Sequence, residues 1–431
     1  MDTNNFFTEH FNKLQSQVGN GNLQELRQKA FHSFNEKGIP LGRNEEWKYT
    51  RISNLFNKQY TFPLQLTSIS EQDLKELRLP GHEAANELVF VNGLFSEVLS
   101  NIRSASLQVQ PLEVAARGEF SNIVSEHLGH SSDYLKDGIN ALNTAFVHGG
   151  VFIYVGKGKT LEHPIYLYNI TDARTGNIFS QPRSLVYLAG NANAQIVETF
   201  NTIGTGESFT NGVMEIVVEQ DAMLEHYKIQ NDASHANQVS TTHIRQIGKS
   251  YVHTVTISLN GGIVRNNLNV VLEAEHCETH LYGLYFIGGD THVDNHTLVD
   301  NVTPHSFSNE FYKGIIDDNA TGIFNGKIMV QRLAQKTNAY QSNKNILLSD
   351  GASVNTKPQL EIFADDVKCS HGCTVGQLDE EGMFYLRSRG IREEKARALL
   401  VHAFAMDVLE HIKPSAIRSY VDHLISERLE S

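Results

Sequence analysis

The chain has 431 residues, 40% of them hydrophobic and 20% charged, so it can hold two or three domains with a large core and is neither disordered nor fibrous. Its formal net charge of −13 argues against binding nucleic acid or an anionic membrane, because both attract basic surfaces. Three cysteines without a repeating spacing do not form a disulfide framework, and we find neither a secretory signal nor a spanning segment. These features predict a soluble cytoplasmic protein.

Residues 1–148 are expected to form an N-terminal region that is helical at first and mixed later. The first helix is indicated by apolar residues at helical spacing, namely Phe7, Phe11 and Leu14. A second helix is predicted over Leu23–Lys37, because Gly38 follows it at the position where a left-handed residue often ends a helix.

Two short motifs in this region have a structural interpretation. The segment LVFVNGL, Leu88–Leu94, predicts a strand that enters an Asn-Gly hairpin turn. The segment NEEWKYT, Asn44–Thr50, contains the only tryptophan. We expect Trp47 and Tyr49 to anchor the helical unit against the rest of the chain.

Residues 149–376 are expected to form a β-domain, because short runs of Val, Ile, Tyr, Thr and Phe alternate with Gly, Asn and Asp clusters. An alignment of the turns by eye places six residues in register, at mostly 26 to 32 residues apart: Ala194, Ala222, Tyr251, Cys277, Ala320 and Ala352. One step of 43 residues would require an insertion. The period matches one coil of a solenoid and favours a right-handed parallel β-helix; an antiparallel sandwich is the alternative.

Residues 377–431 are expected to be helical, with helices over 377–389, 392–412 and 415–429. The middle helix has a broad apolar surface that includes Leu399, Leu400 and Phe404. One domain face rarely needs so much apolar surface, so part of it is expected to pack internally and part to dock a partner.

The junction between the last two regions carries the strongest chemical signal. If Val367–Val375 is extended, Cys369, His371 and Cys373 share one face of the strand. Thiolate and imidazole suit zinc, copper(I), iron and iron–sulfur clusters, but three donors are fewer than a closed structural site uses. The sequence therefore predicts either a site completed by another chain, a transient site, or buried cysteines that only pack.

Other candidate sites are weaker. On a strand, His292, Asp294 and His296 would share one face and could hold iron or zinc, but a solvated sheet surface that presents such a row without any ion is the favoured interpretation. A β-helix hydrolase or lyase acting on carbohydrate would need two carboxylates across a groove, for which the candidates are Glu198, Glu219, Asp221 and Glu225. No nucleotide-binding motif is present, and GKGKT at 156–160 is interpreted as a turn between strands.

The run Gln335–Gly376 and FYLRSRGI at Phe384–Ile391 closely resemble the SufD members of the SufB/SufD family, which belong to the SufBCD iron–sulfur cluster assembly system. The similarity extends upstream through NEFYKGIIDDNATGIFNGKI and, more weakly, to NEEWKYT. SufB members carry a cysteine directly after the Phe-Tyr pair, where this chain has Leu386, and they lack the Cys-Ser-His-Gly run of Cys369–Gly372. Both differences favour SufD.

This resemblance implies a β-helix core and a non-enzymatic scaffold subunit that takes part in iron acquisition and cluster assembly. It implies pairing with SufB through the end of the β-helix, where Cys369 and His371 match interface residues and Cys373 is a weaker additional candidate. It also implies that the C-terminal helices bind the SufC ATPase, which hydrolyses the ATP. The expected docking residues are Tyr385, Arg387, Arg389, Gly390, Leu399, Leu400 and Phe404.

The cofactor and assembly expectations follow from the same resemblance. We expect no cofactor to stay bound to the isolated chain, a transient iron ion or cluster at the SufB interface, and a flavin in the complex as an open alternative. A β-helix exposes an edge at its last coil, so the isolated chain is expected to form a homodimer when SufB is absent.

Overall fold

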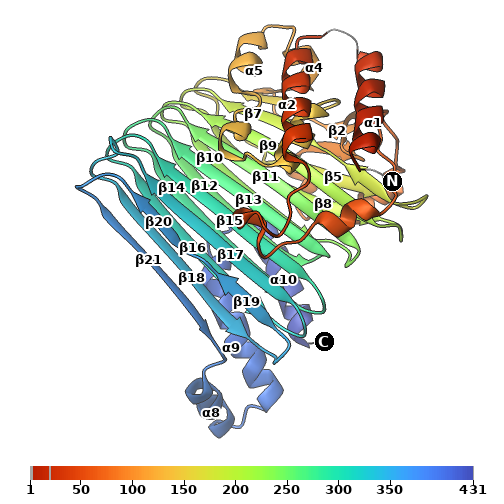
Figure 1. Cartoon of the computed structure of the whole chain (residues 1–431). Helices are drawn as coiled ribbons and strands as arrows, with labels where there is room; N and C mark the ends of the chain where they lie inside the picture. The colour runs from red at the N-terminus through yellow and green to blue at the C-terminus, as the bar shows by residue number, and fades with distance from the viewer. Residues whose placement is uncertain (1–2, 19–20, 431) are drawn as a thin grey trace.

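The computed structural model describes residues 3–18 and 21–430, most of which form a flattened β-helix with helices at both ends of the chain (Figure 1). Each coil contributes one strand to each of two sheets, here named sheet A and sheet B. Sheet A has the order β19-β17-β15-β13-β11-β9-β7-β4-β3, and sheet B has the order β2-β1-β5-β8-β10-β12-β14-β16-β18-β21. The predicted parallel β-helix is confirmed.

The strands of sheet A are β3 (Leu107–Pro111), β4 (Val151–Val155), β7 (Arg183–Leu188), β9 (Ser208–Val218), β11 (Ala236–Gln246), β13 (Ile263–Leu272), β15 (His292–Asn301), β17 (Thr321–Val330) and β19 (Ser353–Thr356). Two further strands pair beside this path, β6 (Ile178–Ser180) with β9 and β20 (Gln359–Ile362) with β17.

The strands of sheet B are β1 (Asn86–Val91), β2 (Leu94–Asn101), β5 (Ile165–Asp172), β8 (Asn193–Ile203), β10 (Met223–Asn231), β12 (Tyr251–Asn260), β14 (Glu278–Ile287), β16 (Phe307–Ile316), β18 (Asn338–Leu347) and β21 (Lys368–Gly376). The β1–β2 pair is the predicted Asn-Gly hairpin, with Asn92 and Gly93 both at positive φ. Strands β1 to β3 precede residue 149, so the two sheets draw strands from the N-terminal region as well.

The coils stack in register, which explains the repeat in the sequence. One row on the inner face of sheet B runs through Leu224, Val252, Thr279, Ser308, Ala339 and Cys369, which are 27 to 31 residues apart. The prediction of an insertion at the 43-residue step is wrong, because the described residues include no extra segment between these coils. Ala194, Ala222, Tyr251 and Cys277 lie at the start of sheet B strands, whereas Ala320 and Ala352 lie at the start of sheet A strands. The alignment therefore crossed from one sheet to the other.

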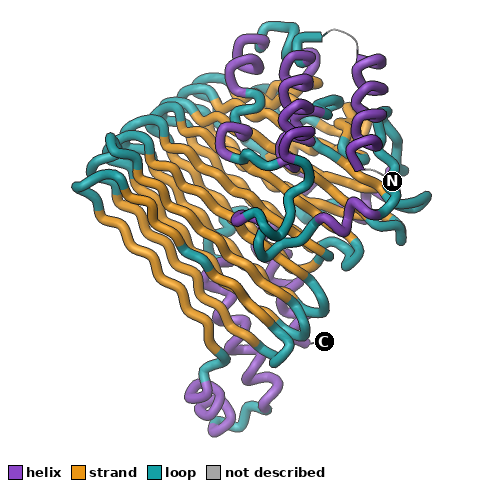
Figure 2. Tube along the Cα trace, in the orientation of Figure 1, coloured by secondary structure: helices purple, strands orange, loops and turns teal. Residues whose placement is uncertain are grey.

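The N-terminal helices cover the outer face of the first strands of sheet A (Figures 1 and 2). They are α1 (Thr3–Val18), α2 (Gln24–Lys37), α4 (Leu112–Ala115), α5 (Ser121–His127), α6 (Ser131–Tyr134) and α7 (Gly138–Ala145). Phe7, Phe11 and Leu14 are buried as predicted, against Phe179 and Phe209 of the sheet among others. Trp47 is buried, but Tyr49 is 41% exposed, so the prediction that both anchor this unit holds for Trp47 alone.

Short helices complete this region: the 3-10 turns η1 (Glu45–Trp47), η2 (Ser53–Asn57) and η3 (His82–Ala84), and α3 (Glu71–Leu77). A buried ion pair fastens the helical cover to the sheet. Arg183 of β7 lies 2.5 Å from Glu215 of β9, and both side chains are at most 2% exposed. Glu215 also accepts hydrogen bonds from the backbone of Gly129 and Ser131, so one carboxylate ties the sheet to the start of α6.

The C-terminal helices are α8 (Glu380–Ser388), α9 (Glu393–Leu409) and α10 (Ser415–Glu430), close to the predicted bounds. Helices α9 and α10 pack against the outer face of sheet B through one apolar cluster, in which Val401 and Val408 meet strand residues such as Tyr227 and Leu284. Helix α8 contains no buried residue and lies beyond the end of the sheets (Figure 1).

The interior of the β-helix combines an apolar cluster that runs through its coils with buried polar side chains. Glu310 of β16 is 1% exposed and accepts a hydrogen bond of 2.6 Å from Gln341 of β18. Burial raises the pKa of Glu310 from 4.5 to about 7. Protonation is therefore favoured in the folded chain, and the contribution of Glu310 to stability is lost as the pH rises from 4.5 through 7.

We predict that Glu310→Gln makes the chain more stable than the wild type at pH 8 but not at pH 4.5, because the amide keeps the shape and never becomes charged. The expected difference in unfolding free energy at pH 8 is about 3 kcal/mol. Urea unfolding of both proteins at the two pH values measures it. An equal effect at both pH values would contradict a buried carboxyl that titrates near neutrality.

Candidate metal-binding strand at the end of the β-helix

Strand β21 is the last strand of sheet B and pairs on one side only, with β18. Its free edge presents backbone N–H and C=O groups that are unpaired within the described part of the chain. In sheet A the corresponding end consists of two short strands, β19 and β20, that both pair with β17. The end of the β-helix is therefore open to another β-strand.

The predicted face of β21 is confirmed, because the strand is extended through Gly372. Cys369, His371 and Cys373 lie in register with Ala339, Gln341 and Asn343 of β18. These β18 partners are at most 3% exposed, which identifies their face as the inner one. Cys369 is half-buried and packs against the apolar cluster that contains Ala339, whereas His371 and Cys373 are exposed at the open end.

The chemistry of this face fits a transient metal site. All three cysteines are free, and burial raises the pKa of the Cys369 thiol, so a bound cation would favour its deprotonation. Residues two apart on a strand have Cα atoms about 7 Å apart, so one strand brings few donors together. No group of three His, Cys, Asp or Glu side chains in residues 3–18 and 21–430 is placed to hold a metal ion. A metal ion bound at β21 would therefore need donors beyond those that the described residues bring together.

Two inner rows of mostly polar residues lead to this strand, and the sequence did not reveal them. One passes from His226 through Thr254, Leu281, Glu310 and Gln341 to His371. The other passes from Lys228 through Thr256, Gly283, Tyr312 and Asn343 to Cys373. The segment LEHYKI could have indicated these rows, because the period of two in a strand places His226 and Lys228 on one face together with Leu224.

His226 and Lys228 are fully buried beside Glu198, and each lies 3.5 Å from its carboxylate. Burial lowers the pKa values of His226 and Lys228. Burial also opposes the charge of Glu198, yet Lys228 and His226 together lower the pKa of that carboxyl. The interior at β8 and β10 thus holds a buried cluster in which the charges of Glu198 and Lys228 offset each other. His371 and Cys373 at the open end are exposed instead.

The comparisons with known proteins identify the family. The model of the SufBD core domain of the SUF iron–sulfur cluster assembly system matches residues 169–404, and the model of the SufBD N-terminal region matches residues 1–167. This chain belongs to the SufBD family. Family membership supports a role in iron–sulfur cluster assembly within the context of a SufBCD complex.

Individual relatives agree with the SufBD assignment. An iron–sulfur cluster assembly SufBD family protein of Synechocystis is 32% identical over 94% of this chain and 91% of its own length. The iron–sulfur cluster assembly protein SufD of Escherichia coli is 30% identical over 91% of this chain and 90% of its own. The chloroplastic protein ABCI7 of Arabidopsis thaliana is 33% identical over 70% of this chain and 64% of its own. One of these relatives is thus named as a chloroplast protein.

The residues of the second candidate metal site of this SufBD chain contact one another and a neighbouring segment. His292, Asp294 and His296 share the outer face of β15, as predicted. Asp294 is fully buried and contacts Arg265 at 3.0 Å and His296 at 3.0 Å, and it accepts a hydrogen bond from Thr50. Thr50 also bonds His292 at 3.0 Å. These side chains hold the NEEWKYT segment on sheet A.

Two of the four carboxylates considered for a carbohydrate-active site lie on opposite faces of sheet B. Glu198 lies in register with Lys228 and faces the interior, whereas Glu225 of β10 faces outward and contacts Lys413. Two catalytic carboxylates must flank one bond on one side of a sheet. GKGKT is a turn between β4 and β5, as predicted. Within the described residues, no helix is long and apolar enough to cross a membrane.

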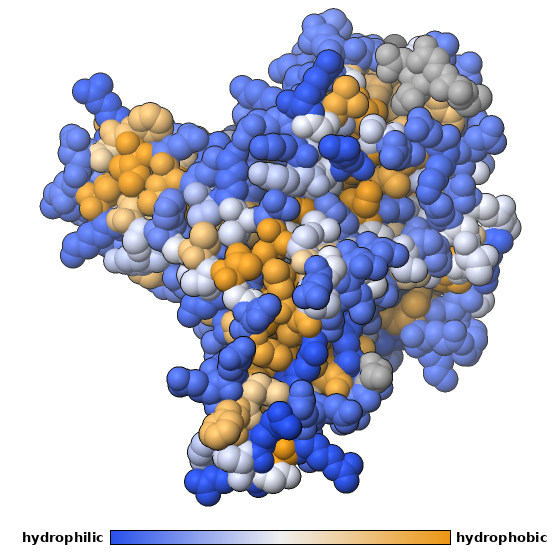
Figure 3. Space-filling model, turned by 60° about the horizontal axis from the view of Figure 1, so that its bottom comes forward, coloured by the Kyte–Doolittle hydropathy of each residue, from blue (hydrophilic) through white to orange (hydrophobic). Residues whose placement is uncertain are grey.

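The residues expected to dock a partner ATPase fall into two groups. Tyr385, Arg387, Arg389 and Gly390 lie on or directly after α8 and are exposed, and the Arg389 guanidinium lies 5.2 Å from the Tyr385 ring. On α9, Leu399 is 44% exposed and Leu400 is half-buried, while Phe404 packs under the ammonium group of Lys313 at 3.9 Å. Apolar residues reach the surface in several patches on the face of the molecule that Figure 3 shows.

We predict that Asp294→Ala lowers the unfolding free energy by about 3 kcal/mol, because it leaves the buried Arg265 without its carboxylate. Urea unfolding measures the change, and Asp290→Ala in an exposed turn nearby is the control that should have little effect. Treatment of the wild type with EDTA should leave its stability unchanged. A loss of stability on chelation would instead assign a metal ion to His292, Asp294 and His296.

Proposed function

We propose that this SufBD chain is the SufD-type scaffold subunit of a SufBCD complex. In this proposal it pairs with SufB through the open end of the β-helix and contributes to iron acquisition and cluster assembly. The observation that carries the proposal is that β21 has a free edge and presents Cys369 and His371 on the same strand.

Edge pairing explains why the donor set of this chain is incomplete. A strand of a second subunit that added to β21 would continue sheet B and bring its own side chains beside Cys369 and His371. Thiolate and imidazole ligands from the two chains would then hold iron or a nascent cluster as cargo. Without SufB, a second copy of this chain would occupy the same edge and form a homodimer.

Cys373 is expected to contribute less to metal or cluster binding than Cys369. Cys373 lies on the correct face but is exposed farther along the strand, and its β18 partner Asn343 is part of a buried hydrogen-bonded network. Cys369 lies deeper, against the apolar end of the core. A cluster held at the interface would therefore depend on Cys369 more than on Cys373.

The proposal assigns no catalytic step to this subunit. ATP hydrolysis belongs to the SufC partner, which is proposed to bind α8 and the exposed side of α9. Helix α8 has no buried residue, and Phe384 and Tyr385 on it are 75% and 57% exposed. Aromatic side chains exposed beside arginines are typical of protein interfaces. A flavin remains an alternative only for the assembled complex.

We predict that Cys369→Ala and His371→Ala each reduce the iron and cluster content of the complex co-expressed with SufB and SufC at least fivefold. Cys373→Ala should reduce it less. Ser370→Ala on the opposite face of the same strand is the matched control and should leave cluster content unchanged. The measurement is anaerobic iron and sulfide analysis with the absorption spectrum, on complexes shown to be intact by gel filtration. Full cluster content in all variants would reduce this strand to a structural role.

We predict that Leu399→Asp weakens binding of SufC at least tenfold without changing the melting temperature, because Leu399 is 44% exposed and its charge would be buried only in the interface. Val114→Asp on α4, where Val114 is 53% exposed, is the control. Isothermal titration of SufC into each variant measures the affinity. Unchanged binding by Leu399→Asp would exclude this face of α9 as the docking surface.

A further inference from the structure

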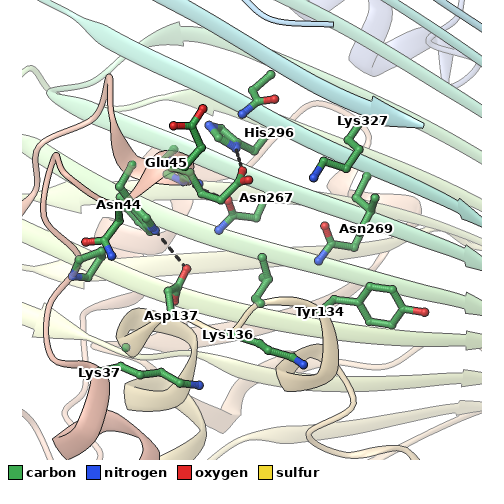
Figure 4. A pocket seen from close by; sticks show the side chains of 18 of the residues that line it. Lys37, Asn44, Glu45, Tyr134, Lys136, Asp137, Asn267, Asn269, His296 and Lys327 are labelled. Atoms are coloured by element: carbon green, nitrogen blue, oxygen red, sulfur yellow. Dashed lines mark hydrogen bonds and ion pairs between the residues drawn. The ribbon is translucent and has the colours of Figure 1, made fainter. Parts of the chain in front are cut away.

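A cavity of about 560 Å³ lies on the outer face of sheet A, where the N-terminal helical cover ends (Figure 4). Its floor comes from β13, β15 and β17. One wall is the segment 37–47 and the other is the segment 134–138 between α6 and α7. The volume lies in the range of sites that bind small molecules. Neither the strand β21 nor the helix α8 contributes to it.

The two walls are held in place by buried interactions. The indole Nε1 of Trp47 donates a hydrogen bond of 3.3 Å to Asp137, which joins one wall to the other. The guanidinium of Arg265 lies 3.8 Å from the centre of the Trp47 ring and donates to the backbone oxygen of Glu46 at 2.6 Å. Since Arg265 is in turn paired with the buried Asp294, the cavity is formed before any ligand enters.

The floor consists of two rows across the three strands. Asn267, His296 and Asn325 form one row, and Asn269, Leu298 and Lys327 form the next. The Asn267 amide is already used, since it accepts from Arg265 and donates to Thr241. Asn269 is 3% exposed, and within residues 3–18 and 21–430 its Nδ2 has no hydrogen-bond partner. A buried N–H donor beside a cavity favours an acceptor on a ligand.

The carboxylates around the cavity are engaged by neighbouring side chains, whereas two of its lysines form no ion pair with the described residues. Each carboxylate that lines it has a partner: Glu45 pairs with Lys357, Glu46 lies 3.5 Å from His296, and Asp137 bonds Trp47 and caps α7. By contrast, Lys37 and Lys136, one on each wall, form no ion pair in the described part of the chain. Figure 4 shows Lys327 and Asn269 directed toward the enclosed space, and Lys327 also lies 3.1 Å from the carboxylate of Glu361. In a chain with a net charge of −13, such a cavity is not a general feature of the surface.

We propose that this cavity binds a small organic anion through a phosphate or carboxylate group. The anionic group lies between the ammonium groups of Lys37 and Lys136, and an acceptor oxygen of the ligand takes the free hydrogen of the Asn269 amide. Phosphate and carboxylate share this chemistry, and the volume admits a molecule larger than a single inorganic ion. The site is independent of the proposed role of β21.

The test is isothermal titration of the full chain at low salt with pyrophosphate, ribose 5-phosphate and citrate, and with glycerol as the uncharged reference. We expect at least one of the three anions to bind with a Kd below about 1 mM, glycerol not to bind, and the affinity to fall as salt is added. Binding of a phosphate compound alone, or of citrate alone, would identify the preferred group.

Variants locate the binding. Lys136→Glu should weaken it at least tenfold, and Asn269→Leu should weaken it by a similar factor. Lys29→Glu makes the same charge change on the exposed side of α2, outside the cavity, and should keep the wild-type affinity. Absence of binding by all three anions would overturn the proposal, as would an equal loss of affinity in Lys29→Glu and Lys136→Glu.

Discussion

The backbone hydrogen bonds between successive coils determine most of this structure. Each strand of a parallel β-helix satisfies its N–H and C=O groups only by pairing with the strands before and after it, so the stack is complete everywhere except at its ends. At the first end, antiparallel strands β2 and β3 close the two sheets. At the last end β21 pairs with β18 alone. The unsatisfied edge is thus a consequence of the fold, and it places the Cys-Ser-His-Gly segment where another chain can reach it.

The helices leave that end uncovered. The N-terminal helices pack on the outer face of sheet A, and α9 and α10 pack on the outer face of sheet B. Both sets bury apolar faces of the sheets, yet neither lies across the edge of β21. The chain therefore presents three separate surfaces: the open end with its sulfur and nitrogen donors, the exposed helix α8, and the cavity between the N-terminal segment and sheet A.

Alternation along single strands was predictable from the sequence, whereas the relations between distant segments were not. The period of two places Cys369, His371 and Cys373 on one face whatever the rest of the chain does. The coil alignment erred because Ala320 and Ala352 resemble the sheet B turns in composition but begin strands of sheet A. On α9, Val401 and Val408 are buried while Leu399 is exposed, since sheet B decides which part of a broad apolar surface is covered. Asp294 suggested a metal ligand when considered alone, but its partners Arg265 and Thr50 come from other strands and loops.

Hydrogen exchange at β21 tests the central claim most directly. Amide exchange of residues 368–376 would be measured by mass spectrometry in the chain diluted until it is monomeric and again in complex with SufB. If the edge is the pairing surface, these amides exchange fast in the monomer and at least tenfold more slowly in the complex, while α10 stays unchanged. Equal exchange of β21 in both states, with protection elsewhere on complex formation, would contradict the account.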